Sequence, residues 1–109
     1  MKMNLGEFEE IVLLLVAVHH EDAYGLSVTN SIKEKLQRSV TLSSVHTALY
    51  RLEEKGFLTS EVGGATGERG GRSKRVFKIT SLGKQALESS RQSREMLWDM
   101  IPKITFEGL

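Results

Sequence analysis

Residues 57–80 read FLTSEVGGATGERGGRSKRVFKIT. Two short runs of strand character, residues 57–62 and 75–80, flank a loop (residues 63–75) that carries five glycines and four basic residues. Strand-like runs joined by a glycine-rich segment predict a long β-hairpin. Glycine has no side-chain bulk and accepts positive φ, so the tip of such a hairpin can follow a groove in a partner.

The segment before this hairpin, residues 41–56, is a predicted helix. Thr41 or Ser43 would cap its start, and Lys55 with Gly56 supplies a cationic last turn and a glycine stop. One face is apolar and predicts burial in a core; it consists of Val45, Ala48, Leu49 and Leu52. The opposite face is small, polar and aromatic; it consists of Ser43, Ser44, His46, Thr47, Tyr50 and Arg51.

Three further helices complete the predicted fold. The first follows a capping pair of Asn4 and Glu7 and ends near residue 19, where an almost entirely apolar surface predicts burial on more than one side. The second covers residues 23–37, with Leu26, Ile32 and Leu36 facing inward. The last begins at residue 80 or 81, and Pro102 ends or bends it.

The resulting order, α-α-α-β-β-α, predicts a mainly α-helical fold with a small β-hairpin: a winged helix-turn-helix with an added C-terminal helix. We expect a winged helix-turn-helix DNA-binding domain at residues 1–80, a dimerisation helix at residues 81–104 and a tail at residues 105–109.

Composition limits the possible function classes. A chain of 109 residues is about one domain long, and the absence of cysteine excludes disulfides, thiolate catalysis and cysteine-bound zinc. The longest apolar run, residues 11–18, has eight residues, against roughly 20 for a membrane-spanning helix. The first ten residues carry three acids and one lysine, unlike a signal peptide. We therefore expect a soluble, cytoplasmic protein.

The net charge of +1 is too balanced to indicate a nucleic-acid partner, but its distribution is uneven. Residues 1–65 hold six Lys/Arg against nine Asp/Glu, whereas residues 66–109 hold nine against five. The positive charge gathers in the loop and the strand that follows it, as a contact patch requires.

A polar helix followed by a basic hairpin suits double-stranded DNA. The major groove admits one helix, whose hydroxyl, basic and apolar groups read base edges, while basic groups on the hairpin hold phosphates. The predicted wing contacts are Arg69, Gly70, Gly71, Arg72, Lys74 and Arg75. The alternatives are a solvated helix face and an ordinary surface loop. The loop matches neither glycine-rich nucleotide-binding pattern.

Residues 19–22, His-His-Glu-Asp, resemble metal ligands but lack the spacing that brings two imidazoles together on a helix. A polar helix end explains them better. No catalytic set of residues is evident, so we predict neither an enzyme nor a cofactor.

The last helix carries a row with heptad spacing and small residues in its middle: Ala86, Ser90, Ser93, Leu97, Met100 and Ile104. This pattern predicts a dimerisation arm that packs against the first helix of a partner chain; the alternative is an exposed, frayed helix. The predicted interface consists of Phe8, Leu87, Ser90, Leu97, Trp98 and Ile101. Trp98 could also line a pocket for a small aromatic effector, together with Met96 or Met100 and the partner's Phe8; plain interface packing is the alternative.

Several of these segments, taken together, resemble the PadR family of bacterial transcriptional regulators. The matching segments are residues 5–10, 23–25, 49–56, 70–72 and 77–80, followed by Gly83. The length is similar to that of the short subfamily with a single C-terminal helix. The resemblance implies a homodimer that binds operator DNA, usually as a repressor, and is often released by a small aromatic or drug-like effector. His46-Thr47 replaces the usual Tyr-Pro of the family.

The leading hypothesis is therefore a homodimeric, DNA-binding repressor. The alternative is a winged-helix protein-interaction module that does not bind DNA; such modules tend to lose the basic wing and to expose an apolar face on the corresponding helix.

Overall fold

The computed structural model describes residues 5–63 and 74–109. Residues 1–4, which include Asn4, and residues 64–73 lie outside the described part. The main elements, in chain order, are α1 (Glu7–His19), α2 (Gly25–Leu36), α3 (Leu42–Glu54), β1 (Leu58–Gly63), β2 (Lys74–Ile79) and α4 (Ser81–Met100), with short 3-10 turns at η1 (His20–Asp22) and η3 (Lys103–Phe106). None of the described helices is long and apolar enough to cross a membrane.

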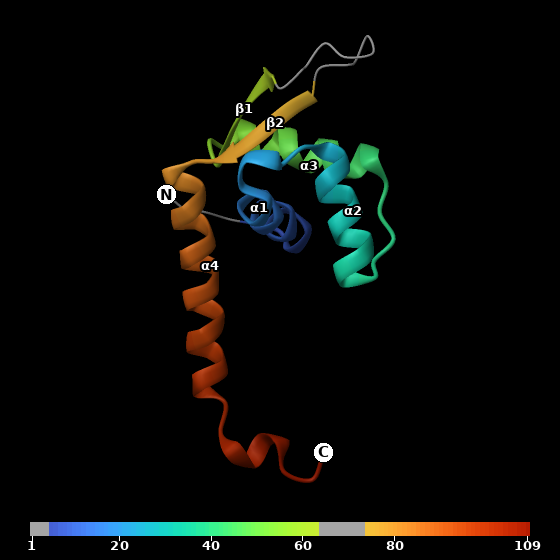
Figure 1. Cartoon of the computed structure of the whole chain (residues 1–109). Helices are drawn as coiled ribbons and strands as arrows, with labels where there is room; N and C mark the ends of the chain where they lie inside the picture. Colours follow the sequence, from blue (N-terminus) through green and yellow to red (C-terminus); the bar gives the residue numbers. More distant parts are fainter. Residues whose placement is uncertain (1–4, 64–73) are drawn as a thin grey trace.

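The first three helices and the hairpin form one packed body, and α4 extends away from it (Figure 1). The core lies between α1, α2 and α3 and is closed by the base of the hairpin. Its fully buried large side chains include Val12, Leu13, Ile32, Leu49, Leu52 and Phe77. This arrangement confirms the predicted winged helix-turn-helix with a C-terminal helix.

The two strands pair antiparallel, with Leu58 opposite Ile79 and Gly63 opposite Lys74. β1 begins and ends one residue later than predicted, and β2 one residue earlier. The hairpin is tied to the helices through its backbone, because the Phe77 amide donates to the Ala23 carbonyl at 2.8 Å. β2 is therefore held against the start of α2.

Two predicted helix starts are confirmed. The Thr41 side chain accepts from the Ser44 amide, and the Thr80 side chain accepts from the Gly83 amide, each at 3.0 Å. The predicted capping pair of Asn4 and Glu7 is wrong, since Gly6 is the N-cap of α1 and no side chain caps it.

Pro102 ends α4 rather than bending it. The helix stops at Met100, and the backbone is extended at Ile101 before Pro102 opens η3. Ile104 therefore does not continue the heptad row of α4, as its spacing had predicted. Ala86 is fully buried against the protomer's own core, so it too is unavailable to a partner.

Three apolar residues assigned to the core face lie largely in solvent. Leu26 and Leu36 in α2 are 50% and 48% exposed, and Val18 in α1 is 64% exposed. The buried residues of α2 are Gly25, Val28, Thr29, Ser31 and Ile32. A helix that packs on one side only buries one stripe, and polar Thr29 and Ser31 belong to that stripe while the leucines flank it.

Candidate nucleic-acid interface

The predicted reading face of α3 lies on the surface of the protomer. Ser43, Ser44, Thr47, Tyr50 and Arg51 are exposed, and His46 is half-buried. The core residues of α3 point the other way, because 3.6 residues per turn separate the two sets. Within the described residues, Ser43 and Arg51 make no side-chain hydrogen bond or ion pair.

His46 and Tyr50 are held by packing. A Cβ built on Gly25 would lie 2.1 Å from Nε2 of His46, so the imidazole fills the space that a side chain at Gly25 would need. The His46 and Tyr50 rings meet edge-on at 6.0 Å between centroids, and Tyr50 meets Phe77 in the same way at 5.8 Å. This chain of contacts joins α2, α3 and β2.

The hydroxyls on α3 donate to the helix itself. Ser44 Oγ donates to the Thr41 carbonyl at 2.9 Å, and Thr47 Oγ1 donates to the Ser43 carbonyl at 3.1 Å. Ser44 thus forms a reciprocal cap with Thr41, whose side chain accepts from the Ser44 amide. Sequence reasoning had treated both hydroxyls as free to read bases.

The described part of the basic wing is its C-terminal strand. Lys74 and Arg75 are exposed at the start of β2. The Lys74 ammonium lies 4.1 Å from the centroid of the Tyr24 ring, and Arg75 donates to Ser60 Oγ at 3.0 Å. The other predicted wing residues lie outside the described residues: Arg69, Gly70, Gly71 and Arg72.

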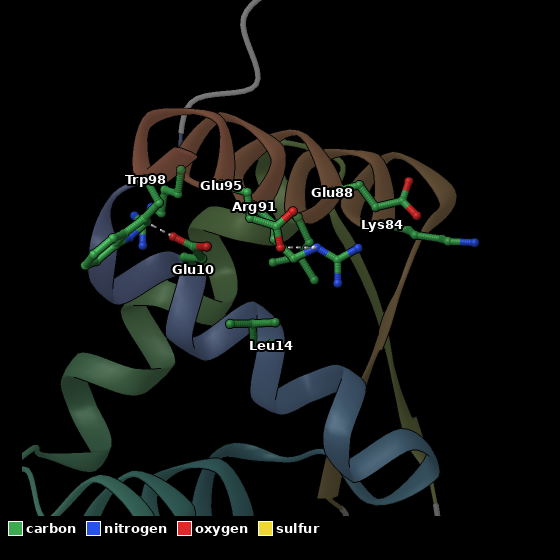
Figure 2. A pocket seen from close by; sticks show the side chains of 9 residues that line it. Glu10, Leu14, Lys84, Glu88, Arg91, Glu95 and Trp98 are labelled. Atoms are coloured by element: carbon green, nitrogen blue, oxygen red, sulfur yellow. Dashed lines mark ion pairs between the residues drawn. The ribbon is translucent and has the colours of Figure 1, made fainter. Parts of the chain in front are cut away.

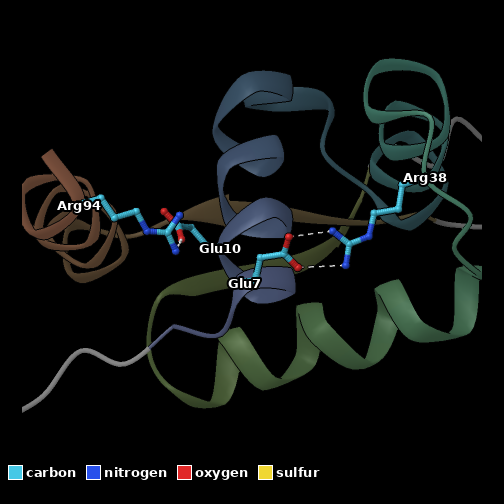
Figure 3. Close-up of polar contacts among 4 residues, drawn as sticks. All are labelled: Glu7, Glu10, Arg38 and Arg94. Carbon is cyan, nitrogen blue, oxygen red and sulfur yellow. Dashed lines mark hydrogen bonds and ion pairs between the residues drawn. The ribbon is translucent and has the colours of Figure 1, made fainter. Parts of the chain in front are cut away.

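Three glutamates at the start of α1 bind basic residues on three other segments. Glu7 accepts two hydrogen bonds of 3.1 Å from Arg38 in the α2–α3 connection, and Glu10 pairs with Arg94 of α4 at 2.9 Å (Figure 3). Glu9 pairs with Lys55, just after α3, at 2.6 Å. These pairs link α1 to the α2–α3 connection, to the end of α3 and to the second half of α4.

The Arg38 guanidinium, through its hydrogen bonds and its charge, lowers the pKa of the Glu7 carboxyl below its ordinary value of 4.5, and Glu7 in turn raises the pKa of Arg38. Arg38 also lies 5.5 Å from the centroid of the Phe8 ring. Sequence analysis missed Arg38 because its partners are 30 or more positions away and no local spacing relates them.

Four large apolar side chains near the C-terminal end of α4 are uncovered in the protomer. Leu97 and Trp98 are 59% and 66% exposed, with Met96 and Met100 similarly open. The remaining predicted interface residues, Phe8, Leu87, Ser90 and Ile101, are half-buried. Trp98 packs in a tilted arrangement on Phe106, with the ring centroids 6.4 Å apart.

A groove of about 540 Å³ lies between α1 and α4 (Figure 2). Leu14, Leu87 and Trp98 form its apolar wall, and the Glu10–Arg94 and Arg91–Glu95 ion pairs border it. Neither Met96 nor Met100, the predicted neighbours of Trp98, lines this groove. Leu14, on the almost entirely apolar surface of α1, is 45% exposed in the protomer.

No cluster of potential metal ligands occurs in the described ranges, 5–63 and 74–109. Nε2 of His19, one of the histidines considered above, lies 2.7 Å from Ser31 Oγ in α2. The histidine thus joins two helices through a hydrogen bond.

Solved structures share this fold. A PadR-like transcription factor from Bacteroides fragilis aligns with a TM-score of 0.71 and 22% identity over 84% of each chain. A PadR-like regulator from Bacillus cereus aligns with a TM-score of 0.72 and 19% identity over 94% of this chain and 93% of the other. Bacillus subtilis PadR, solved in complex with operator DNA, aligns with a TM-score of 0.63 and 23% identity over 88% of this chain but only 48% of its own length.

No match was found among curated proteins. The model of the transcriptional regulator PadR-like family matches residues 13–89, which covers the second half of α1, the helix-turn-helix, the wing and the first half of α4. The resemblance inferred from short motifs is thus confirmed, and the family consists of regulators rather than enzymes. The chain belongs to the PadR-like family of transcriptional regulators.

Proposed function

We propose that the protein is a homodimeric transcriptional repressor that binds operator DNA through α3 and the basic hairpin. The observation that carries this proposal is the continuity of the exposed α3 face with the basic start of β2, since Tyr50 packs on Phe77 beside it. An exposed helix of this size fits the major groove, and basic groups next to it can hold the flanking phosphates. The Bacillus subtilis relative solved with operator DNA supports the same partner.

In this proposal residues 1–80 form the DNA-binding domain, residues 81–104 the dimerisation segment and residues 105–109 a tail. The last turns of α4 support the dimer, because exposed Leu97, Trp98 and Met100 would lose contact with water in an interface with a second chain. Two copies of α3 would then lie about 34 Å apart and read two half-sites on one face of the duplex.

DNA binding is tested by gel shift with the promoter of the protein's own operon and with random DNA of equal length. The protein should bind the promoter more tightly, and Arg72→Ala should weaken binding to both DNAs and reduce the dependence of affinity on salt, because a phosphate contact is lost. Unchanged affinity of Arg72→Ala for both DNAs would exclude the wing mechanism.

The groove between α1 and α4 supports regulation by a small effector. Trp98 and two leucines offer an apolar wall to a planar aromatic molecule, and a ligand there would contact both helices. The chain has one tryptophan, so its fluorescence reports on this groove directly. Titration with a panel of planar aromatics should quench it and release operator DNA; an unresponsive panel would contradict regulation at this groove.

The second candidate, a protein-interaction module without DNA binding, is favoured only by Leu42, which is 45% exposed at the start of α3. The remaining exposed face of α3 carries hydroxyl, aromatic and basic groups, and exposed Lys74 and Arg75 lie beside it. The absence of affinity for either DNA would favour the second candidate.

A further inference from the structure

Thr47 lies on the exposed face of α3, away from the buried stripe formed by Val45, Ala48 and Leu49. Its exposed neighbour one turn earlier, Ser43, is small. A helix with small side chains at its centre can bring its backbone close to base edges. Any base that faces the middle of α3 would therefore meet Thr47.

The hydroxyl of Thr47 has no proton to offer such a base, because Oγ1 donates it to the Ser43 carbonyl at 3.1 Å. The neighbouring Ser44 hydroxyl is used in the same way, on the Thr41 carbonyl. Two groups of Thr47 can then still contact a base: the γ-methyl, and the lone pairs of Oγ1, which can only accept.

The two aromatic side chains near Thr47 on α3 already pack against other residues of the protomer. His46 fills the space over Gly25, and Tyr50 packs between His46 and Phe77. The centre of the predicted reading face therefore presents the Thr47 methyl, with small Ser43 one turn before it and exposed Tyr50 and Arg51 one turn after it. Thymine is the base that presents a methyl in the major groove, and apolar contact is how proteins recognise it.

We propose that Thr47 recognises a thymine of the operator half-site through its γ-methyl rather than through its hydroxyl. This inference rests on the proposed DNA-binding function and specifies one base in the sequence that the protein prefers.

The experiment compares two substitutions of Thr47, each of which removes one of the two groups on its Cβ, the hydroxyl or the methyl. Thr47→Val keeps the methyl and removes the hydroxyl, whereas Thr47→Ser keeps the hydroxyl and removes the methyl. A preferred operator is first selected from a random pool with the wild-type protein, and each thymine in its footprint is then replaced singly by deoxyuridine, which preserves base pairing and removes only the 5-methyl.

One thymine per half-site should be sensitive for the wild type, with a loss of about fourfold in affinity for one lost methyl contact. Thr47→Val should show the same sensitivity. Thr47→Ser should bind the unmodified operator about fourfold more weakly and should not distinguish thymine from uracil at that position. Thr105→Ser, which removes a methyl from exposed η3, is the matched control and should behave as the wild type.

The inference is overturned if no thymine is sensitive, if Thr47→Ser keeps the full sensitivity, or if Thr47→Val loses affinity while Thr47→Ser keeps it. The last result would assign the contact to the hydroxyl oxygen and a base amino group. If the selection yields no preferred sequence, the proposed function itself fails, and the two failures are thereby distinguished.

Discussion

The contact between Gly25 and His46 shows how one residue can set the position of α3, the proposed DNA-reading helix. The imidazole occupies the place of a side chain at the first residue of α2, so any larger residue there must displace it. The family resemblance associates this position of α3 with tyrosine, and His46 is the residue that fills the space in this chain.

Gly25→Ala should destabilise the protein by about 1–3 kcal/mol, because the new methyl would overlap the His46 ring. In a His46→Ala background the same change should be close to neutral or slightly stabilising, since alanine favours the helix more than glycine. Urea unfolding of the four proteins measures this coupling. If Gly25→Ala lowers the free energy of unfolding equally in both backgrounds, the His46 ring does not oppose a side chain at residue 25.

The ion pair between Glu7 and Arg38 predicts a dependence of stability on pH. The pKa of Glu7 is lowered in the folded protein, so its contribution is present above the ordinary value of 4.5 and is lost as the pH falls through the lowered value. The difference in Tm between the wild type and Glu7→Gln should therefore be constant at neutral pH and vanish in acid. A difference that does not decrease at all as the pH falls below the ordinary value would contradict this origin.

At the scale of elements, α4 divides into two functional halves. Its first turns pack on the protomer: Gly83 and Ala86 are buried, and a Cβ on Gly83 would lie 2.3 Å from the Phe57 carbonyl oxygen. Its second half exposes an apolar row that the protomer does not cover. The helix begins as part of the core and ends with apolar side chains that the proposed dimer would cover.

Leu97→Glu should convert a dimer into a monomer of 12.2 kDa, because a charge in an apolar interface is costly to bury without a partner. Gln92→Glu, on the opposite face of α4, is the matched control and should leave the mass unchanged. Light scattering coupled to size exclusion measures both. A wild type that is already monomeric at micromolar concentration would exclude the proposed arm.

At the scale of the whole molecule, α1 connects α3, the β1–β2 hairpin and α4. Three glutamates in its first turn form ion pairs with other segments: Glu7 with the α2–α3 connection, Glu9 with the end of α3, and Glu10 with α4. The groove beside Trp98 includes the last of these pairs, so the proposed effector would lie next to an ion pair between α1 and α4.

The proposed dimer also predicts the geometry of the operator. Two reading helices fixed about 34 Å apart require half-sites one helical turn apart on the same face of the duplex. Insertion of about five base pairs between the half-sites should abolish specific binding, and insertion of a full turn should restore part of it. Gel shifts with these operators measure the effect; tolerance of the half-turn insertion would exclude a rigid two-fold arrangement.

Local sequence determined the elements of this protein and their order. The caps at Thr41 and Thr80, the helix stop at Pro102, the hairpin around the glycine loop and the core stripe of α3 all depend on residues close together in the chain. Such signals act through neighbouring backbone groups, so they can be read without the fold. The family motifs lie in these same segments, which is why the resemblance was recognisable.

The tertiary structure alone decided which side chains remain free. Leu26 and Leu36 are exposed because α2 packs on one side only, and His46 is committed because α2 brings Gly25 against α3. The partners of the three glutamates come from distant segments, and the groove at Trp98 exists because α4 lies along α1. Pattern and spacing predict which residues can form a face, but burial and contact depend on what the rest of the chain places against it.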